Sequence, residues 1–208
     1  PLTPMKLNVQ HLQRAITEGK DDPEMVERIS ATLIDQIDSL SAIAREFSDF
    51  AKMPQPRHSR INLVPKLNSL QQLFESTDNA RIHIDMGGHK KVYVMADKEQ
   101  LMRVFINLVK NGLQSIPEGR DGTIRIELKK ESPGKVEVTV SDNGKGIPEE
   151  IRDKLFQPNF TTKSGGMGMG LAITYNIIRS MGGRIWYDTV LHEGTTFHVE
   201  LPESLEKR

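Results

Sequence analysis

The sequence predicts an α+β protein in which an N-terminal antiparallel helical hairpin precedes an α/β sandwich. Apolar residues recur in heptad steps over residues 1–53, whereas alternating strand patterns mixed with helical stripes follow after residue 60. Two prolines in Met53-Pro-Gln-Pro-Arg57 separate the regions, because proline ends a helix and stiffens the chain that follows. We therefore expect the hairpin at 1–53, a linker at 54–60 and the sandwich at 61–208.

The hairpin is predicted from two helical heptad patterns. Gly19 ends the first helix, and Asp22 and Pro23 supply an N-cap and a first-turn proline for the second. One hairpin cannot bury both apolar seams, so we expect half of a four-helix bundle, which implies a homodimer through the N-terminal helices. The alternative is a hairpin that packs on the sandwich of its own chain. The seam positions are Leu2, Met5, Val9, Leu12 and Ile16, then Val26, Ile29, Leu33, Leu40, Ile43, Phe47 and Phe50.

The sandwich is predicted from alternating and helical periods. We expect one sheet with its helices on a single face. The expected helices span 65–76, 97–116, 148–156 and 169–182, and the expected strands span 81–86, 91–95, 123–130, 135–142, 183–189 and 195–201.

Composition limits the classes of function. Basic and acidic residues number 28 each, so no general positive charge favours nucleic acid or an anionic membrane surface. No apolar run reaches the roughly 20 residues of a membrane helix. The absence of cysteine excludes disulfides and thiolate metal sites. We expect a cytoplasmic location, no nucleic-acid partner and no direct membrane contact in this part of the protein.

A buried carboxylate is predicted at the end of strand 135–142. Val136, Val138 and Val140 share one face, and the period of two places Asp142 on that face as well. The turn Asn143-Gly-Lys-Gly146 follows, and its glycines allow a flat group to approach the backbone. A purine amino group would satisfy the carboxylate, and Thr195 points inward from a second strand. The alternative for this segment is a strand that ends in an ordinary Asx turn.

A polar column is predicted on the helix at 97–116. Asn107 and Asn111 lie one turn apart beside its apolar stripe, with Lys110 between them. An amide oxygen is a suitable ligand for Mg²⁺, which keeps several waters and takes few protein ligands. The alternative is a pair of solvated asparagines on the flank of a helix.

A phosphate site is predicted where a glycine-rich segment opens the last helix. Lys163-Ser-Gly-Gly-Met-Gly-Met-Gly170 precedes Leu171, and free backbone N–H groups at a helix start bind anions. The segment lacks the ending of a Walker P-loop and does not follow the first strand as a Rossmann fingerprint would.

Together these segments resemble the Bergerat ATP-binding fold of the histidine kinases. Asn107–Asn111 resembles the N box, and Asp142–Gly146 resembles the first glycine box. Phe156 with Phe160–Lys163 resembles the F box, Gly166–Gly170 the second glycine box and Gly194–Phe197 the last one. Gly112 departs from the family, which usually has alanine there, and we expect this smaller residue to threaten no contact.

The resemblance implies ATP and Mg²⁺ as cofactors. Asn111 would ligate Mg²⁺, Asp142 would bind the adenine amino group with help from Thr195, and residues 157–170 would form a mobile lid over the triphosphate. Lys110 and Lys163 are candidates for phosphate contact. The expected nucleotide-binding residues are Asn107, Lys110, Asn111, Asp142, Gly144, Gly146, Phe160, Thr161, Thr162, Lys163, Gly166, Gly168, Gly170, Leu171 and Thr195.

The opening Pro1-Leu-Thr-Pro-Met-Lys-Leu7 is similar to the segment after the phosphoacceptor histidine, with wording close to NtrY-type nitrogen-regulation sensors. That resemblance implies an acceptor before Pro1, so we expect no catalytic residue in this chain and no autophosphorylation by it. His11 lies too far along the helix to be the acceptor.

The resemblance implies a protein-histidine kinase of a two-component system, which transfers the γ-phosphoryl group of ATP to a histidine and thence to the receiver domain of a response regulator. A Bergerat-fold ATPase is one alternative, although such enzymes place a glutamate base where Asn107 stands. A nucleotide-dependent dimerisation module without kinase activity is another.

Overall fold

The computed structural model describes residues 2–19, 22–51, 56–74, 80–130, 133–158, 160–161 and 168–204. The chain divides into two compact units, which are considered separately. The first comprises residues 1–53 with 161–167, and the second comprises residues 54–160 with 168–208.

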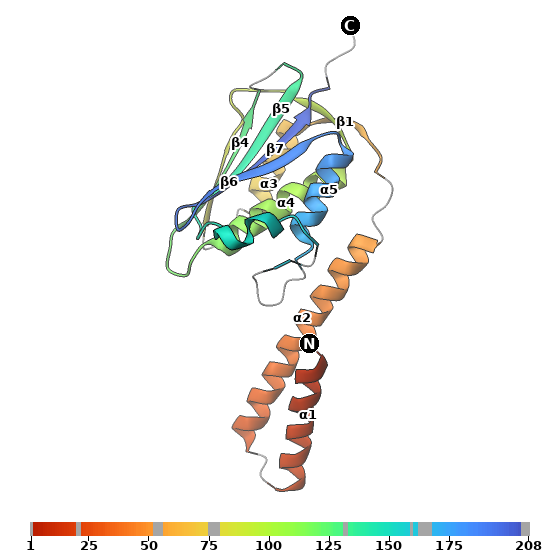
Figure 1. Ribbon diagram of the computed structural model, residues 1–208, viewed down its shortest axis with the longest axis vertical. Helices are drawn as coiled ribbons and strands as arrows, with labels where there is room; N and C mark the ends of the chain where they lie inside the picture. The colour runs from red at the N-terminus through yellow and green to blue at the C-terminus, as the bar shows by residue number, and fades with distance from the viewer. Residues whose placement is uncertain are drawn as a thin grey trace. The chain divides into compact units, whose positions relative to one another are not determined.

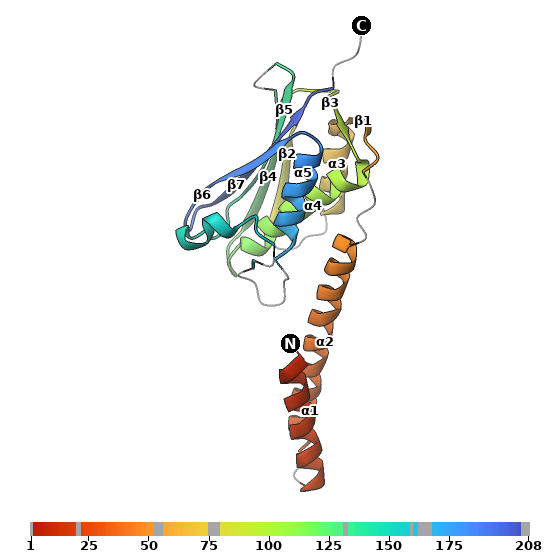
Figure 2. The same ribbon diagram turned by 45° about the vertical axis from the view of Figure 1, so that its right-hand side comes forward.

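The first unit contains the helical hairpin. Helix α1 spans Leu2–Thr17 and α2 spans Pro23–Ala51, and the two helices lie side by side in both ribbon views (Figures 1 and 2). Ala15 and Ile29 are buried between them, whereas Val9 and Ile16 of the predicted seam are 41% and 54% exposed. The helices are therefore where the heptad pattern predicts them, and part of their apolar seam is not covered within one chain.

A five-stranded sheet forms the framework of the second unit within the described residues. Its strand order is β2-β4-β5-β7-β6, with β2 parallel to β4 and the other neighbours antiparallel. The helices α3, α4 and α5 cover one face of this sheet, as predicted (Figures 1 and 2). The strands are β2 Ala80–Asp85, β4 Gly122–Lys129, β5 Lys135–Asp142, β6 Arg184–Val190 and β7 Gly194–Pro202, and the helices are α3 Leu63–Leu73, α4 Lys98–Ser115 and α5 Gly170–Ser180.

The core lies between the sheet and these helices. Alternate residues of the central strands point into it, because successive side chains of a strand face opposite sides. The largest fully buried side chains include Phe105, Leu101 and Leu108 of α4, against Ile124, Ile126 and Leu128 of β4. The alternation that predicted the strands thus also decides which of their side chains face the helices.

The prediction of a single sheet is wrong in one respect. Strand β3, Tyr93–Ala96, does not join the large sheet but pairs antiparallel with β1, Ser59–Asn62. β1 begins inside the expected linker and has one apolar residue in four, so it shows no alternation that a sequence pattern could detect. The Leu63 N–H also donates to the Val92 carbonyl, which ties the start of α3 to this small sheet.

The start of α4 shows how the local sequence sets an element, and the predicted helix at 148–156 differs in type. Asp97 caps α4, where its Oδ1 accepts hydrogen bonds from the N–H groups of Glu99 and Gln100 at 3.0 Å each. The backbone donor of Gln100 is the main cause that holds the pKa of Asp97 below its ordinary value of 3.8. The predicted helix at 148–156 is instead a 3-10 helix, η1, over Glu149–Lys154.

Candidate nucleotide-binding site

The carboxylate of Asp142 lies at the end of β5, against α4. A methyl group at Gly112 of α4 would come within 3.1 Å of Asp142 Cβ and 2.7 Å of Ile124 Cδ1, so helix and strands approach closely here. Asp142 Oδ1 accepts hydrogen bonds from Ser115 Oγ at 2.9 Å and from the Gly144 N–H at 2.8 Å. Asp142 therefore occupies the helix-covered face that the period of two predicts. Gly112 lets the helix approach this face more closely than an alanine would, because the methyl group of an alanine would contact Ile124 and Asp142.

The turn after Asp142 is held by side chains as well as by its glycines. Asn143 Oδ1 accepts from the Thr123 N–H at 2.8 Å, and its Nδ2 donates to the Asp121 carbonyl at 2.9 Å. Gly146 has φ 70°, and a Cβ there would lie 2.3 Å from the Val190 carbonyl oxygen. The glycine is required because the hairpin between β6 and β7 passes directly behind it.

Arg120 binds this turn, although sequence reasoning did not single it out. Its Nη1 donates to the carbonyl oxygens of Asn143 at 2.7 Å, Gly144 at 3.1 Å and His192 at 3.2 Å. The guanidinium thus joins the turn to the β6–β7 hairpin. A lone arginine in a loop carries no local signal that would predict this role.

Thr195 lies beside Asp142, since the two residues are partners in the register of β5 and β7. Its side chain is 5% exposed, and its hydroxyl lies 2.9 Å from Thr189 Oγ1. Gly194 precedes it at φ 139°, where a Cβ would lie 1.9 Å from the Asp142 carbonyl oxygen. The two predicted polar residues thus lie side by side, because their strands are neighbours in the sheet.

The asparagine column of α4 faces two environments. Asn107 Nδ2 donates to Thr174 Oγ1 of α5 at 2.9 Å, and a Cβ at Gly170 would lie 2.6 Å from Asn107 Oδ1. Asn111, one turn later, is half-buried, and Lys110 is exposed. Asn107 therefore contacts the start of α5, while Asn111 lies one turn nearer to Asp142 along the helix.

The glycine-rich segment is described only in part. Of the predicted site residues, Thr162, Lys163 and Gly166 lie outside the described residues. Phe160 is half-buried and Thr161 exposed, and Gly170 and Leu171 begin α5 as predicted. Gly168 has φ 66°, and a Cβ there would lie 2.1 Å from the Phe160 carbonyl oxygen. Phe160 and Gly168, both within the lid predicted at 157–170, therefore lie close together.

Phe156 of the expected F box belongs to an aromatic cluster. Its ring centroid lies 5.6 Å from that of Tyr175 and 6.0 Å from that of Tyr187, which in turn lies 5.9 Å from Phe197. The Tyr187 hydroxyl donates to the Arg152 carbonyl at 3.1 Å, and burial raises the pKa of Tyr187 above its ordinary value of 10.0. The cluster fixes η1 to the sheet, next to the segment predicted to cover the triphosphate.

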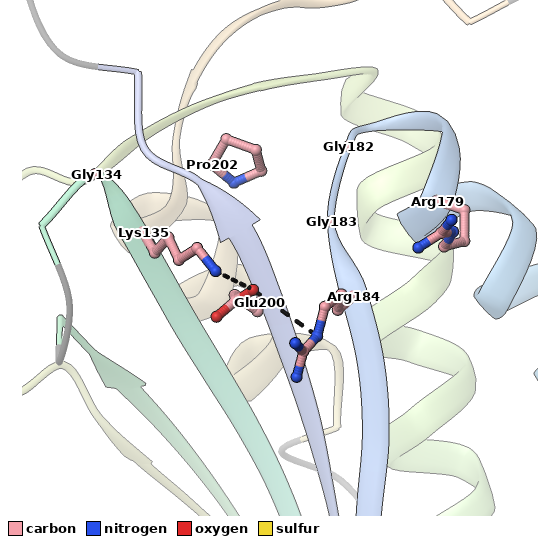
Figure 3. A pocket seen from close by; sticks show the side chains of 8 residues that line it. All are labelled: Gly134, Lys135, Arg179, Gly182, Gly183, Arg184, Glu200 and Pro202. Atoms are coloured by element: carbon pink, nitrogen blue, oxygen red, sulfur yellow. Dashed lines mark hydrogen bonds and ion pairs between the residues drawn. The ribbon is translucent and has the colours of Figure 1, made fainter.

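A hollow lined by charged residues lies at the other end of β5 (Figure 3). Lys135 and Asp142 are the first and last residues of that strand, so they are separated by about 23 Å at 3.3 Å per residue. Lys135 and Arg184 approach the Glu200 carboxylate, at 2.9 Å and 4.0 Å. This hollow is far from Asp142 and shares no residue with the predicted nucleotide site.

The part of the chain that the structure describes has neither a cluster of metal-ligating side chains nor a membrane-spanning helix. No group of three or more His, Asp or Glu side chains there could hold a metal ion by itself. None of the helices described is long and apolar enough to cross a bilayer.

A mixed, mainly antiparallel sheet covered on one face by helices, with a carboxylate and a glycine turn at one end, defines the class of α/β-sandwich ATP-binding domains. Residues 96–205 match the family described as histidine kinase-, DNA gyrase B-, and HSP90-like ATPase. The chain belongs to this family.

The chain is similar to several proteins that are named as kinases. Sporulation kinase A of Bacillus subtilis (strain 168) is 34% identical over 170 residues, which cover 79% of this chain but 28% of that protein. The catalytic domain of histidine kinase ThkA is 33% identical with a TM-score of 0.63, over 71% of this chain and 96% of that one. ThkA in complex with response regulator protein TrrA is 28% identical with a TM-score of 0.72, over 100% of this chain and 61% of that one. The chain thus spans less than a third of sporulation kinase A and nearly all of the ThkA catalytic domain.

Proposed function

We propose that this chain is the ATP-binding catalytic core of a two-component sensor histidine kinase. It would transfer the γ-phosphoryl group of MgATP to a histidine, from which the group passes to an aspartate of a response regulator. The observation that carries the proposal is the Asp142 carboxylate, held by two donors at the end of β5 and in register with Thr195.

Adenine recognition rests on Asp142 and Thr195. An ionised carboxylate only accepts hydrogen bonds, and it can accept about four. The Ser115 hydroxyl and the Gly144 N–H both donate to Oδ1, and the exocyclic amino group of adenine is a donor of the kind such a carboxylate accepts. Gly144 leaves room beside the carboxylate for the Ser115 hydroxyl, and Gly146 leaves room for the backbone of the β6–β7 hairpin.

Magnesium and phosphate binding rest on α4 and the start of α5. Asn111 would hold Mg²⁺ through its amide oxygen, and the ion would neutralise the charge that develops on the transferred group. Lys110 is exposed on the same helix and would contact phosphate. Gly168, Gly170 and Leu171 lie at the N-terminal end of α5, where backbone N–H groups favour an anion. Phe160 to Gly166 would complete the lid over the triphosphate.

The kinase is favoured over an ATP hydrolase by Asn107. An amide cannot accept a proton at neutral pH, so Asn107 cannot activate water as a glutamate would. Its Nδ2 is instead engaged with Thr174 of α5. Asn107 therefore fits an enzyme that transfers the phosphoryl group to a histidine rather than to water.

The hairpin is proposed to supply dimerisation, with domains at 1–53 and 61–208 joined by a linker at 54–60. The exposed seam residues Val9 and Ile16 support a four-helix bundle between two copies of the chain. The similarity of Pro1–Leu7 to the segment after an acceptor histidine supports an acceptor before residue 1, in a sensor of the NtrY type. We place the domain in the cytoplasm, where a receiver domain would be its partner.

The test is calorimetric titration of the chain with a non-hydrolysable ATP analogue, with and without Mg²⁺. Asp142→Asn should weaken binding by about 10–150-fold, since a hydrogen bond to a charged group is lost and two donors then face each other. Asn111→Ala should abolish the enhancement by Mg²⁺. Asp188→Asn and Asn68→Ala make the same chemical changes at exposed positions and should bind as the parent does. Absence of binding by the parent would refute the proposal.

A further inference from the structure

The hydroxyl of Ser115 contacts the Asp142 carboxylate from α4. Ser115 is the last residue of that helix, and its Oγ lies 2.9 Å from Asp142 Oδ1. The same Oγ lies 2.7 Å from the carbonyl oxygen of Gly112, three residues earlier. The hydroxyl proton can serve one acceptor at a time, and an ionised carboxylate is the stronger of the two.

Gly144 leaves room for this hydroxyl because it has no side chain. A Cβ at residue 144 would lie 1.8 Å from Ser115 Oγ and 2.7 Å from Asp142 Oδ1. Real Cβ atoms do not approach so closely, so any other residue at 144 would displace the hydroxyl from the carboxylate. The Lys145 N–H also donates to the Ser115 carbonyl at 3.0 Å, which fixes the backbone of the turn against the helix end.

We propose that Ser115 is a positioning residue for purine recognition. With the Gly144 N–H, its hydroxyl holds Asp142 Oδ1 from two sides and so sets the plane of the carboxylate before a nucleotide arrives. A carboxylate fixed in advance loses less rotational freedom on binding a base. The inference rests on the proposed function, because it concerns the same Asp142, but it assigns a selectivity for the 6-amino group of adenine to a residue outside the glycine turn.

The variants Ser115→Ala and Ser115→Thr test this role, since the first removes the hydroxyl and the second retains it. Each is titrated with the non-hydrolysable ATP analogue and with the corresponding inosine nucleotide, which has a carbonyl in place of the 6-amino group. Ser115→Ala should bind the adenine nucleotide about 5-fold more weakly, and Ser115→Thr should bind it within about 2-fold of the parent. The weaker binding of the inosine nucleotide should not change in either variant.

Ser180→Ala is the matched control. Ser180 is the last residue of α5, and its hydroxyl donates to the Ile177 carbonyl, again three residues earlier, at 2.7 Å. The variant removes the same helix-end hydrogen bond from a serine that has no carboxylate partner among the described residues, and it should leave both affinities unchanged. Equal losses for the adenine and inosine nucleotides in Ser115→Ala would overturn the inference, as would an unchanged adenine affinity. A parent that binds no ATP analogue would instead refute the proposed function itself.

Discussion

The hydrogen bond between Asn107 and Thr174 joins α4 to α5 and can be removed from either side. Asn107 Nδ2 donates to Thr174 Oγ1 at 2.9 Å, and the Thr174 side chain is 1% exposed. Asn107 was predicted to bind nucleotide, yet this contact gives it a packing role. The variants Asn107→Ala, Thr174→Val and the double variant separate the two roles.

The expected energies follow from burial. Asn107→Ala leaves a buried hydroxyl without this partner and opens a small gap, so it should lower the free energy of unfolding by about 1–3 kcal/mol. Thr174→Val keeps the shape of the side chain, and the half-buried Asn107 amide can turn to water, so about 0.5–1.5 kcal/mol is expected. The double variant removes both partners, and the coupling between the two changes should be about 1 kcal/mol.

Urea denaturation of the four proteins measures the coupling, and titration with the ATP analogue measures binding. If packing is the main role of Asn107, Thr174→Val should reproduce a large part of any loss of nucleotide affinity in Asn107→Ala. A coupling near zero would refute the packing argument. A loss of affinity in Asn107→Ala that Thr174→Val does not share would assign Asn107 directly to the nucleotide.

Two further predictions concern a helix cap and a glycine. Asp97→Ala should destabilise the chain by about 0.5–2 kcal/mol at pH 7 through loss of the α4 cap. Because folding lowers the pKa of Asp97, the ionised cap stabilises the fold above the unfolded pKa of this carboxyl. The difference in stability between the variant and the parent should therefore shrink as pH falls below 3.8 in acid titrations followed by circular dichroism. A constant difference in stability would contradict this. Gly194→Ala should lower the melting temperature much more than Gly119→Ala. Both glycines have positive φ, but a Cβ at Gly194 would lie 1.9 Å from a backbone oxygen, whereas a Cβ at Gly119 would meet nothing within 4 Å. Equal shifts would show that strain alone decides.

The fold could be predicted where a long element carries one clear period. The eight-residue strands β4 and β5 carry apolar residues at every second position, at 124, 126 and 128 and at 136, 138 and 140, and the 18-residue helix α4 carries an apolar stripe. β1 has four residues and a single buried one, so its pairing with β3 depends on tertiary contact that a local pattern does not contain. For the same reason, the predicted strand at 91–95 was assigned to the single large sheet, whereas β3 pairs with β1.

The site could be predicted where chemistry and period coincide. Asp142 and Thr195 are polar residues at apolar positions of strands, which places them on the covered face. Ser115 and Arg120 were missed because their partners lie far along the chain, 27 residues away for Asp142 and 72 for His192. A signal for Ser115 did exist, since it continues the four-residue column that begins at Asn107.

The glycines of the motifs require a different physical explanation from the one that the sequence suggested. The glycines at 144 and 146 were interpreted as room for a ligand, yet a Cβ at either would first meet another segment of this chain. The same holds for a Cβ at Gly170 or Gly194. These residues thus let the turn, the β6–β7 hairpin and the two helices approach one another closely. Substitution of such a glycine should therefore disturb the fold and nucleotide binding together. A polar residue such as Asp142 can be changed without that clash, so the polar variants rather than the glycine variants can separate recognition from stability.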